Sequence, residues 1–236
     1  MPLLGHLGEL RKRLIRAALA VGVGASASLY WSDELMRWLM RRAGVELVFL
    51  SPAEAFWVSL KVALIFGLFL ALPVVFYQLW RFISPGLRPK ERRYGIGFVF
   101  SSTAFFILGA TFCMFVVLPF GLRFLFQYGE GIGLKPMISI GAYVDFVIKF
   151  LLAFGLIFEL PLVITFLARL GLLTPAFLAR NRKYAVLIAF VVGAFLTPTP
   201  DIFNQSLMAV PLIVLYEIGI WSARIFGRSE AKAESD

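Results

Sequence analysis

The sequence predicts an all-α polytopic membrane protein with six transmembrane helices, both ends in the cytoplasm. The chain has 236 residues, of which 60% are hydrophobic, and a mean hydropathy of +0.86. A soluble domain is nearer half apolar, so the surplus apolar surface needs the bilayer as its solvent. No polar linker divides the chain, and residues 1–236 are therefore expected to form a single transmembrane domain.

Six apolar runs account for the expected spans. A helix rises 1.5 Å per residue, so about 20 residues cross a hydrocarbon core of about 30 Å. The first four runs reach that length, and the last two are shorter, which predicts a short final hairpin in a concave arrangement. A cleaved signal peptide is an alternative for the first run, but five further apolar runs follow it. The spans are expected at about 14–31, 58–80, 94–118, 143–168, 184–197 and 205–222.

The orientation follows from the distribution of basic residues. With the N-terminus in the cytoplasm, the cytoplasmic segments and the adjoining helix ends carry 16 of the 23 Lys and Arg residues. Short loops rich in Lys and Arg remain on the cytoplasmic side of the membrane, so both termini are predicted to be cytoplasmic. The cytoplasmic segments are then residues 1–13, 81–93, 169–183 and 224–236.

The first loop on the opposite side is expected to be structured. Ser32 suits the N-cap of an amphipathic helix that Gly44 terminates. Residues 51–54, Ser-Pro-Ala-Glu, have the pattern of a capping box in which the Glu54 carboxylate would return to the backbone at Ser51. This box would open the second span.

Residues 51–81 and residues 139–169 form a weak internal sequence repeat, which we call the echo. Eleven of the 31 positions are identical at a shift of 88 residues, including Lys61 with Lys149 and Pro73 with Pro161. Chance similarity among apolar residues is the alternative explanation, but the paired polar residues and prolines favour a true repeat. Each copy would run in the same direction and bend at its proline.

Several function classes are disfavoured by the composition. His6 is the single histidine and Cys113 the single cysteine, which leaves little basis for histidine catalysis or a transition-metal site. The motifs of phosphate-binding loops, serine hydrolases and zinc proteases are missing. No enzyme activity, catalytic residue, metal or cofactor is therefore expected. The net charge of +9 is assigned to membrane orientation, and no nucleic-acid partner is expected.

Glu159 is the most informative polar residue. It lies near the middle of the fourth predicted span, and its counterpart in the echo is Ala71. A carboxylate in hydrocarbon costs at least ~2.5 kcal/mol, so such a residue marks a functional site by default. The alternative is a protonated side chain that caps a carbonyl freed by Pro161.

Glu9 and Glu91 are carboxylates in the predicted cytoplasmic segments, among many basic residues. Glu9 could simply pair with Arg13 four residues later or with Lys12 three residues later, and Glu91 could stabilise the first turn of a helix that starts at Pro89. The functional alternative is a ligand that carries arginine, because a guanidinium binds a carboxylate through two parallel hydrogen bonds.

Gln205 opens the last predicted span, after a tight turn at residues 197–201. It could serve only the local helix start, or it could offer hydrogen bonds to a polar group on a partner helix.

Four motifs give the chain a resemblance to a known family. It resembles TatC, the core membrane subunit of the twin-arginine protein translocase, over almost its whole length. All four motifs occur in order, which makes the resemblance specific. They are residues 6–14 (HLGELRKRL), 82–93 (FISPGLRPKERR), 153–161 (AFGLIFELP) and 196–205 (LTPTPDIFNQ).

The resemblance implies a receptor and assembly core in a bacterial or archaeal cytoplasmic (inner) membrane. Its expected partners are TatA-like and TatB-like single-span subunits, membrane lipid, and the twin-arginine signal peptides of folded cargo. Proton motive force would drive export, and several copies would share one complex. The implied signal-peptide site contains Glu9, Phe82, Leu87 and Glu91. Glu159 matches the intramembrane polar position of the family, and Gln205 matches the position that contacts partner helices.

Two rival functions remain from the residues alone. A proton-coupled secondary transporter would use Glu159 as a proton relay. Many such folds are built from two inverted repeats, however, whereas the echo is a single span repeated in the same direction. An intramembrane enzyme would need catalytic pairs that the sequence does not contain.

Overall fold

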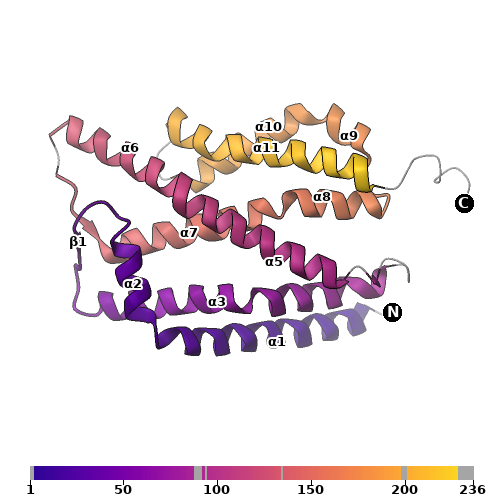
Figure 1. The fold of residues 1–236 in the computed structure, drawn as a ribbon, viewed down its shortest axis with the longest axis horizontal. Helices are drawn as coiled ribbons and strands as arrows, with labels where there is room; N and C mark the ends of the chain where they lie inside the picture. The colour runs from indigo at the N-terminus through magenta and orange to yellow at the C-terminus, as the bar shows by residue number, and fades with distance from the viewer. Residues whose placement is uncertain (1–2, 88–91, 94, 134, 198–200, 228–236) are drawn as a thin grey trace, which may run out of the picture. The chain divides into compact units, whose positions relative to one another are not determined.

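The computed structural model describes residues 3–87, 92–93, 95–133, 135–197 and 201–227, with side chains from residue 7 onward. Its long elements are all α-helices, so the prediction of an all-α protein is confirmed for these residues (Figure 1). The elements in chain order are α1 (Leu3–Leu29), α2 (Ser32–Met40), β1 (Leu47–Val48), α3 (Glu54–Ile83), η1 (Ser84–Gly86), α5 (Gly95–Phe112), η2 (Cys113–Val117), α6 (Leu118–Gly131), β2 (Ile138–Ser139), α7 (Ile140–Phe158), α8 (Leu160–Arg169), α9 (Pro175–Arg180), α10 (Arg182–Leu196) and α11 (Ile202–Phe226).

Four helical segments within the described residues are long and apolar enough to cross a membrane. α1 and α2 meet at an angle of 79° and would make a fifth span if they are taken together. α10 has 15 residues, which is about 22 Å of helix and shorter than a bilayer core of about 30 Å. The count of six spans and their orientation therefore stay predictions. The four segments are Glu54–Gly86, Gly95–Gly131, Ile140–Arg169 and Ile202–Phe226.

The chain divides into two compact units, each of which is described by itself. The first unit contains Met1–Ile107 and Leu125–Ile148, and the second contains Leu108–Phe124 and Lys149–Asp236. Three of the described helices contribute residues to both units: α5, α6 and α7.

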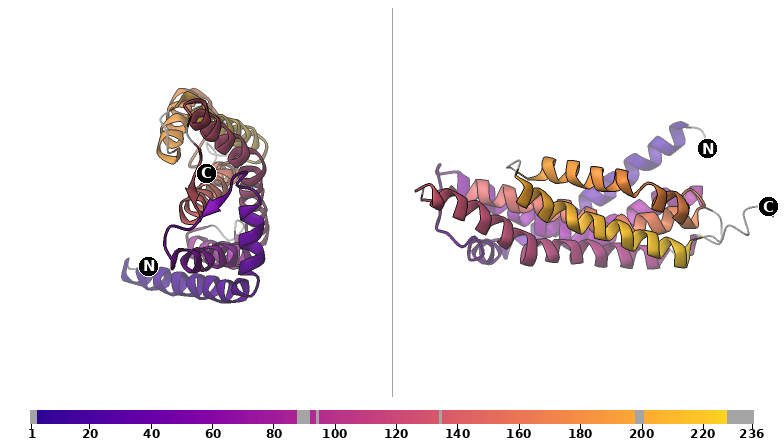
Figure 2. Two further views of the ribbon diagram at one scale, coloured as in Figure 1. Left: turned by 90° about the vertical axis from the view of Figure 1, so that its left-hand side faces the viewer. Right: turned by 90° about the horizontal axis from the view of Figure 1, so that it is seen from above.

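The first unit is built on the close pairing of α1 with α3, which lie side by side (Figures 1 and 2). A Cβ atom at Gly24 would collide with the Gly67 carbonyl group, and a Cβ atom at Gly67 would collide with the backbone of Ala25. Glycine at both positions thus allows the two backbones to touch, as small residues do in membrane helix pairs.

This contact gives a matched test on a single helix. Gly24→Ala should lower the free energy of unfolding by about 1–3 kcal/mol, because the added methyl group has no space. Gly22→Ala adds the same group where no atom lies within 4 Å, so helix propensity should raise stability by about 0.5–1 kcal/mol. Thermal unfolding of the purified protein in detergent measures both changes. Equal effects of the two substitutions would contradict the contact.

The segment that leads into α2 differs from the prediction. Ser32 is the first helical residue, and Trp31 occupies the N-cap position. The Ser32 hydroxyl donates a hydrogen bond to the Leu29 carbonyl at 2.9 Å, so the predicted capping role of Ser32 is wrong. Gly44 adopts a φ of 74° in the turn beyond α2, a conformation that suits glycine.

Ser51 does not provide the predicted cap of α3: Ala53 holds the N-cap position without a side-chain cap, although the Glu54 carboxylate does interact with the Ser51 backbone. The same carboxylate accepts hydrogen bonds from the Leu50 amide at 2.6 Å and from the Gly141 amide at 2.8 Å. Gly141 lies in the first turn of α7, where backbone N–H groups have no partner within the helix. Beside its local partners, Glu54 thus binds an amide 87 residues away, which a local pattern cannot reveal.

Two further contacts hold the same end of the first unit together. β1 and β2 pair in parallel, with Leu47 opposite Ile138 and Val48 opposite Ser139. One to two turns further along, Lys61 of α3 donates to both oxygens of Asp145 of α7, at 2.6 and 2.9 Å. We call this region the β end of the first unit.

In the second unit, the second copy of the echo is interrupted. α7 ends at Phe158 and α8 begins at Leu160, whereas α3 continues as one helix through Pro73. Pro161 lacks the N–H group that would continue the helical hydrogen bonds, so a break beside it is expected. Glu159 lies at the break.

The core of the second unit lies where α8 and α10 pack on α11. Lys149, the echo counterpart of Lys61, donates to the Phe195 carbonyl in the last turn of α10 at 3.2 Å. Asp201 caps α11 by accepting from the Asn204 amide at 2.7 Å. The buried core residues are Ile164, Ala168, Leu178, Ala189, Ala209, Leu212, Ile220 and Ala223.

Candidate functional site

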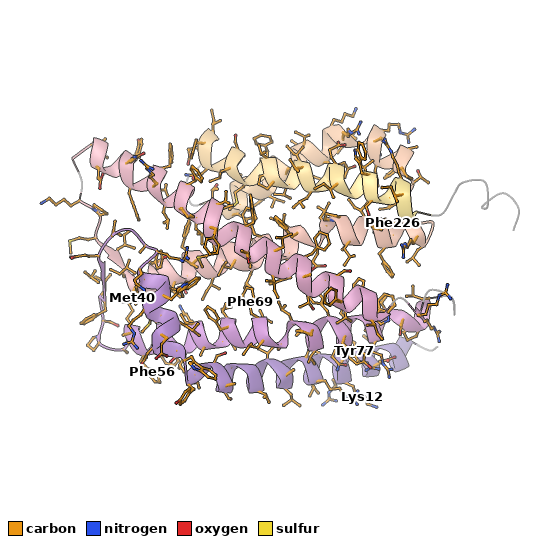
Figure 3. The ribbon with its side chains drawn as sticks, in the orientation of Figure 1. Lys12, Met40, Phe56, Phe69, Tyr77 and Phe226 are labelled. Carbon is orange, nitrogen blue, oxygen red and sulfur yellow. The ribbon has the colours of Figure 1, made fainter. Side chains whose placement is uncertain are left out.

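A pocket of about 570 Å³ lies in the first unit. The pocket lies at the end of the α1–α3 pair where Figure 3 labels Lys12 and Tyr77, and Met40 and Phe56 are labelled at the other end. We call the end with Lys12 and Tyr77 the pocket end. α1, α3, η1, residues 92–93 and the start of α5 supply the described lining, which includes Glu9, Arg13, Tyr77, Trp80, Arg81, Ser84, Pro85, Arg92, Arg93, Gly95 and Ile96.

Glu9 is held in a short chain of polar contacts. Its Oε1 atom lies 3.0 Å from Nη2 of Arg13, one helical turn later on α1. Nη1 of Arg13 donates to Oε1 of Gln78 on α3 at 3.3 Å. The side chains of Glu9 and Arg13 are 27% and 13% exposed. The buried Gln78 amide thus orients Arg13, and Arg13 orients a carboxylate that still reaches solvent.

Arg92 is fixed by the loop that precedes it. Its Nε atom donates to the Leu87 carbonyl at 3.2 Å, and its Nη2 atom donates to the Pro85 carbonyl at 3.0 Å. Both partners are neutral, so these bonds position the guanidinium and leave its charge uncompensated.

Aromatic side chains shape the α3 wall of the pocket. The Arg81 guanidinium lies 5.9 Å from the centre of the Tyr77 ring. The centre of the Trp80 ring lies 5.0 Å from the centre of the Phe98 ring of α5. A Cβ atom at Gly95 would collide with the Trp80 indole, so glycine allows α5 to start against α3.

The structure treats the four predicted signal-peptide residues differently. Glu9 lines the pocket. Phe82 is half-buried near the end of α3, and Leu87 is only 7% exposed, so its side chain supports the loop rather than the pocket surface. Glu91 lies outside the described residues.

Sequence reasoning missed several residues of this pocket. The spacing of Glu9 and Arg13 indicated their pairing, but Gln78 was overlooked. An amide inside an apolar span is itself a signal, because buried polar groups need partners. Trp80 carried no such signal, because its place in the pocket depends on the packing of α5 against α3.

Glu159 and Gln205 lie in the second unit. Glu159 is 9% exposed and occupies the N-cap position of α8, but its side chain does not cap that helix. The amide nitrogen of Gln205 donates to the Phe190 carbonyl of α10 at 2.9 Å. One donor of Gln205 therefore joins α11 to α10, and its amide oxygen remains for another group. No cluster of three or more metal-binding side chains occurs among the described residues.

Comparison with known proteins decides the family. The family model for TatC, Sec-independent protein translocase protein, matches residues 5–211. This chain belongs to the TatC family. A TatC protein of Desulforapulum autotrophicum is 44% identical over 241 residues, covering all of this chain and 88% of the relative. A TatC protein of Aquifex aeolicus is 40% identical over 240 residues, covering 99% of each chain.

Solved TatC structures agree in fold. A crystal structure described as the twin arginine translocase receptor TatC is 40% identical, covers 94% of this chain and all of that chain, and gives a TM-score of 0.80. A second, in the detergent DDM, is 41% identical with a TM-score of 0.81, covering 92% of this chain and 98% of that chain. The family predicted from the four motifs is confirmed. The protein is a membrane component of a Sec-independent protein translocase, and its family works in transport rather than in catalysis.

Proposed function

We propose that this TatC protein is the receptor and assembly core of a twin-arginine translocase. It binds the twin-arginine signal peptides of folded cargo at the pocket end, which would face the cytoplasm. The observation that carries this proposal is the partly exposed Glu9 carboxylate in a pocket large enough for a peptide segment. The two solved relatives described as twin arginine translocase receptors support it.

The chemistry of recognition rests on carboxylates. A signal-peptide guanidinium would bind Glu9 beside Arg13, while Gln78 keeps Arg13 in place. Glu91 would receive the second guanidinium, and the half-buried Phe82 at the end of α3 and the buried Leu87 after η1 would belong to the same site. Bidentate geometry would favour arginine over lysine, because an ammonium group cannot make two parallel bonds.

Recruitment of single-span partners would use the second unit. The amide oxygen of Gln205, which accepts no hydrogen bond from the described residues, could accept one from a polar group on a TatA-like or TatB-like helix. Further along α11, an exposed apolar stripe at helical spacing offers a surface for lipid or for such a helix. The stripe contains Val210, Val214, Ile218, Trp221 and Ile225.

Proton motive force would drive export from a bacterial or archaeal cytoplasmic (inner) membrane, with several copies per complex. Glu159 is the intramembrane group suited to this step or to assembly, because it is buried and ionisable at a helix break. The proposed topology has six spans with both ends in the cytoplasm.

Cysteine labelling tests that topology. Lys12→Cys at the pocket end should react with an impermeant maleimide only from the cytoplasmic side, and Lys135→Cys only from the opposite side. Both positions are exposed, and native Cys113 is fully buried, so background labelling should be low. Reaction of both cysteines from one side would overturn the topology.

Photo-crosslinking tests the receptor function. A twin-arginine peptide that carries a photoreactive group should crosslink to α1 and α3 residues of the pocket, mapped by mass spectrometry. A twin-lysine peptide of the same length is the control and should crosslink much less. Crosslinks confined to the β end, or equal for both peptides, would refute the proposal.

A further inference from the structure

Among the described residues of the pocket, Arg81 and Arg92 carry charges that their contacts do not neutralise. Four arginines line the pocket, and Glu9 is the one carboxylate among its described lining residues. Glu9 is already engaged by Arg13. Arg92 spends two donors on neutral carbonyl groups, and Arg81 lies beside the Tyr77 ring, so neither guanidinium is neutralised by these contacts.

The geometry of Arg81 and Arg92 suits an anion. Backbone carbonyls hold the Arg92 guanidinium in place, and most of its five N–H donors remain for a ligand. Arg81 lines the same pocket from α3. Guanidinium groups bind phosphate with short, charge-assisted hydrogen bonds, and a preorganised guanidinium loses little freedom on binding.

An apolar track leads from the pocket along α5. Ile96 lines the pocket and is 87% exposed, and Phe100, one turn later, is 76% exposed. Both residues belong to the candidate membrane span Gly95–Gly131. A polar, basic pocket therefore opens on an apolar helix surface at the end of a span, the level at which lipid headgroups lie.

We propose that this pocket binds an anionic phospholipid, whose phosphate contacts Arg81 and Arg92 and whose acyl chain lies along Ile96 and Phe100. The apolar track favours a lipid over free phosphate. The two guanidinium groups of Arg81 and Arg92 favour an anionic over a zwitterionic headgroup, because a choline or ethanolamine group would bring its own positive charge beside them. Where a twin-arginine peptide enters the same pocket, the phosphate would reduce the repulsion that the peptide meets.

Lipid binding is measured without any peptide, so its outcome is independent of the receptor proposal. The purified full chain is titrated with phosphatidylglycerol or phosphatidylcholine, and bound lipid is counted by native mass spectrometry. Arg81→Gln combined with Arg92→Gln should weaken phosphatidylglycerol binding by about tenfold or more, since each charge-assisted bond is worth about a factor of ten. Binding of phosphatidylcholine should change less than about twofold.

The matched control is Arg180→Gln combined with Lys183→Gln, which removes two exposed charges from the second unit on the same predicted side of the membrane. An equal loss in this control would show general surface attraction and overturn the proposal. Because Arg92 also holds its loop, Arg81→Gln is measured alone and should still weaken binding. Ile96→Ser should weaken lipid binding but leave inorganic phosphate binding unchanged. Competition by phosphate alone as strong as by phosphatidylglycerol would show an anion site without lipid specificity.

Discussion

Replacing Glu9 with glutamine should weaken the binding of a twin-arginine peptide by about tenfold or more. A hydrogen bond to a charged group is worth about 1.5–3 kcal/mol, and 1.4 kcal/mol corresponds to a factor of ten in affinity. Glutamine keeps the shape of the side chain and removes its charge. Glu91→Gln should have a similar effect, and the double variant should lose more than either single variant.

Peptide titration by fluorescence anisotropy, with thermal unfolding of each variant, separates recognition from helix support. Glu9 also pairs with Arg13 on its own helix, a contact worth about 0.2–0.5 kcal/mol. Glu34→Gln is the matched control, because Glu34 pairs with Arg37 of α2 at 3.8 Å, away from the pocket. If peptide affinity holds in Glu9→Gln while the Tm falls, Glu9 serves only α1. A twin-lysine peptide should bind the intact protein less well than the twin-arginine peptide.

Replacing Glu159 with alanine should reduce export of a folded reporter by about tenfold or more, whereas Glu159→Gln should fold normally. Glu159, between Phe158 and Leu160, is 9% exposed, and keeping its carboxyl group in an apolar span costs at least ~2.5 kcal/mol. A residue kept at that cost is expected to act in transport or assembly. Export is measured in cells that lack their own TatC protein, with the amount of each variant in the membrane determined alongside.

The control for Glu159→Ala is Leu160→Ala. It removes a comparable volume from the adjacent position, which packs against the core of the second unit, but no polar group. Loss of export in both variants to the same extent would indicate a packing defect. Full export by Glu159→Ala would refute a functional role for the carboxyl group.

The sequence predicted features that depend on local spacing or on bulk composition. The apolar runs predicted the helical class, and the spacing of Glu9 and Arg13 on one helix predicted their contact, observed at 3.0 Å. Features that depend on distant partners were missed. Glu54 satisfies the pattern of a capping box but also binds Gly141. Gln78 accepts a hydrogen bond from Arg13, a role that depends on the packing of α1 against α3.

The echo shows the same limit. It identified Pro73 and Pro161 as equivalent, and each was expected to bend its helix. Only the second copy is interrupted, at Glu159. The residue two positions before the proline differs between the copies, Ala71 in the first and Glu159 in the second, so a proline alone does not predict the break.

The contact between Glu54 and Gly141 has a consequence for biosynthesis. The Gly24–Gly67 pairing joins neighbouring hairpin segments and can form early, but the Glu54 carboxylate must wait for an amide 87 residues further along the nascent chain. At about 5–20 residues per second, the ribosome needs about 4–17 s to supply that partner. During this interval β1 also lacks β2, so its backbone groups have no partner strand. Slow translation between residues 54 and 141 would lengthen this interval.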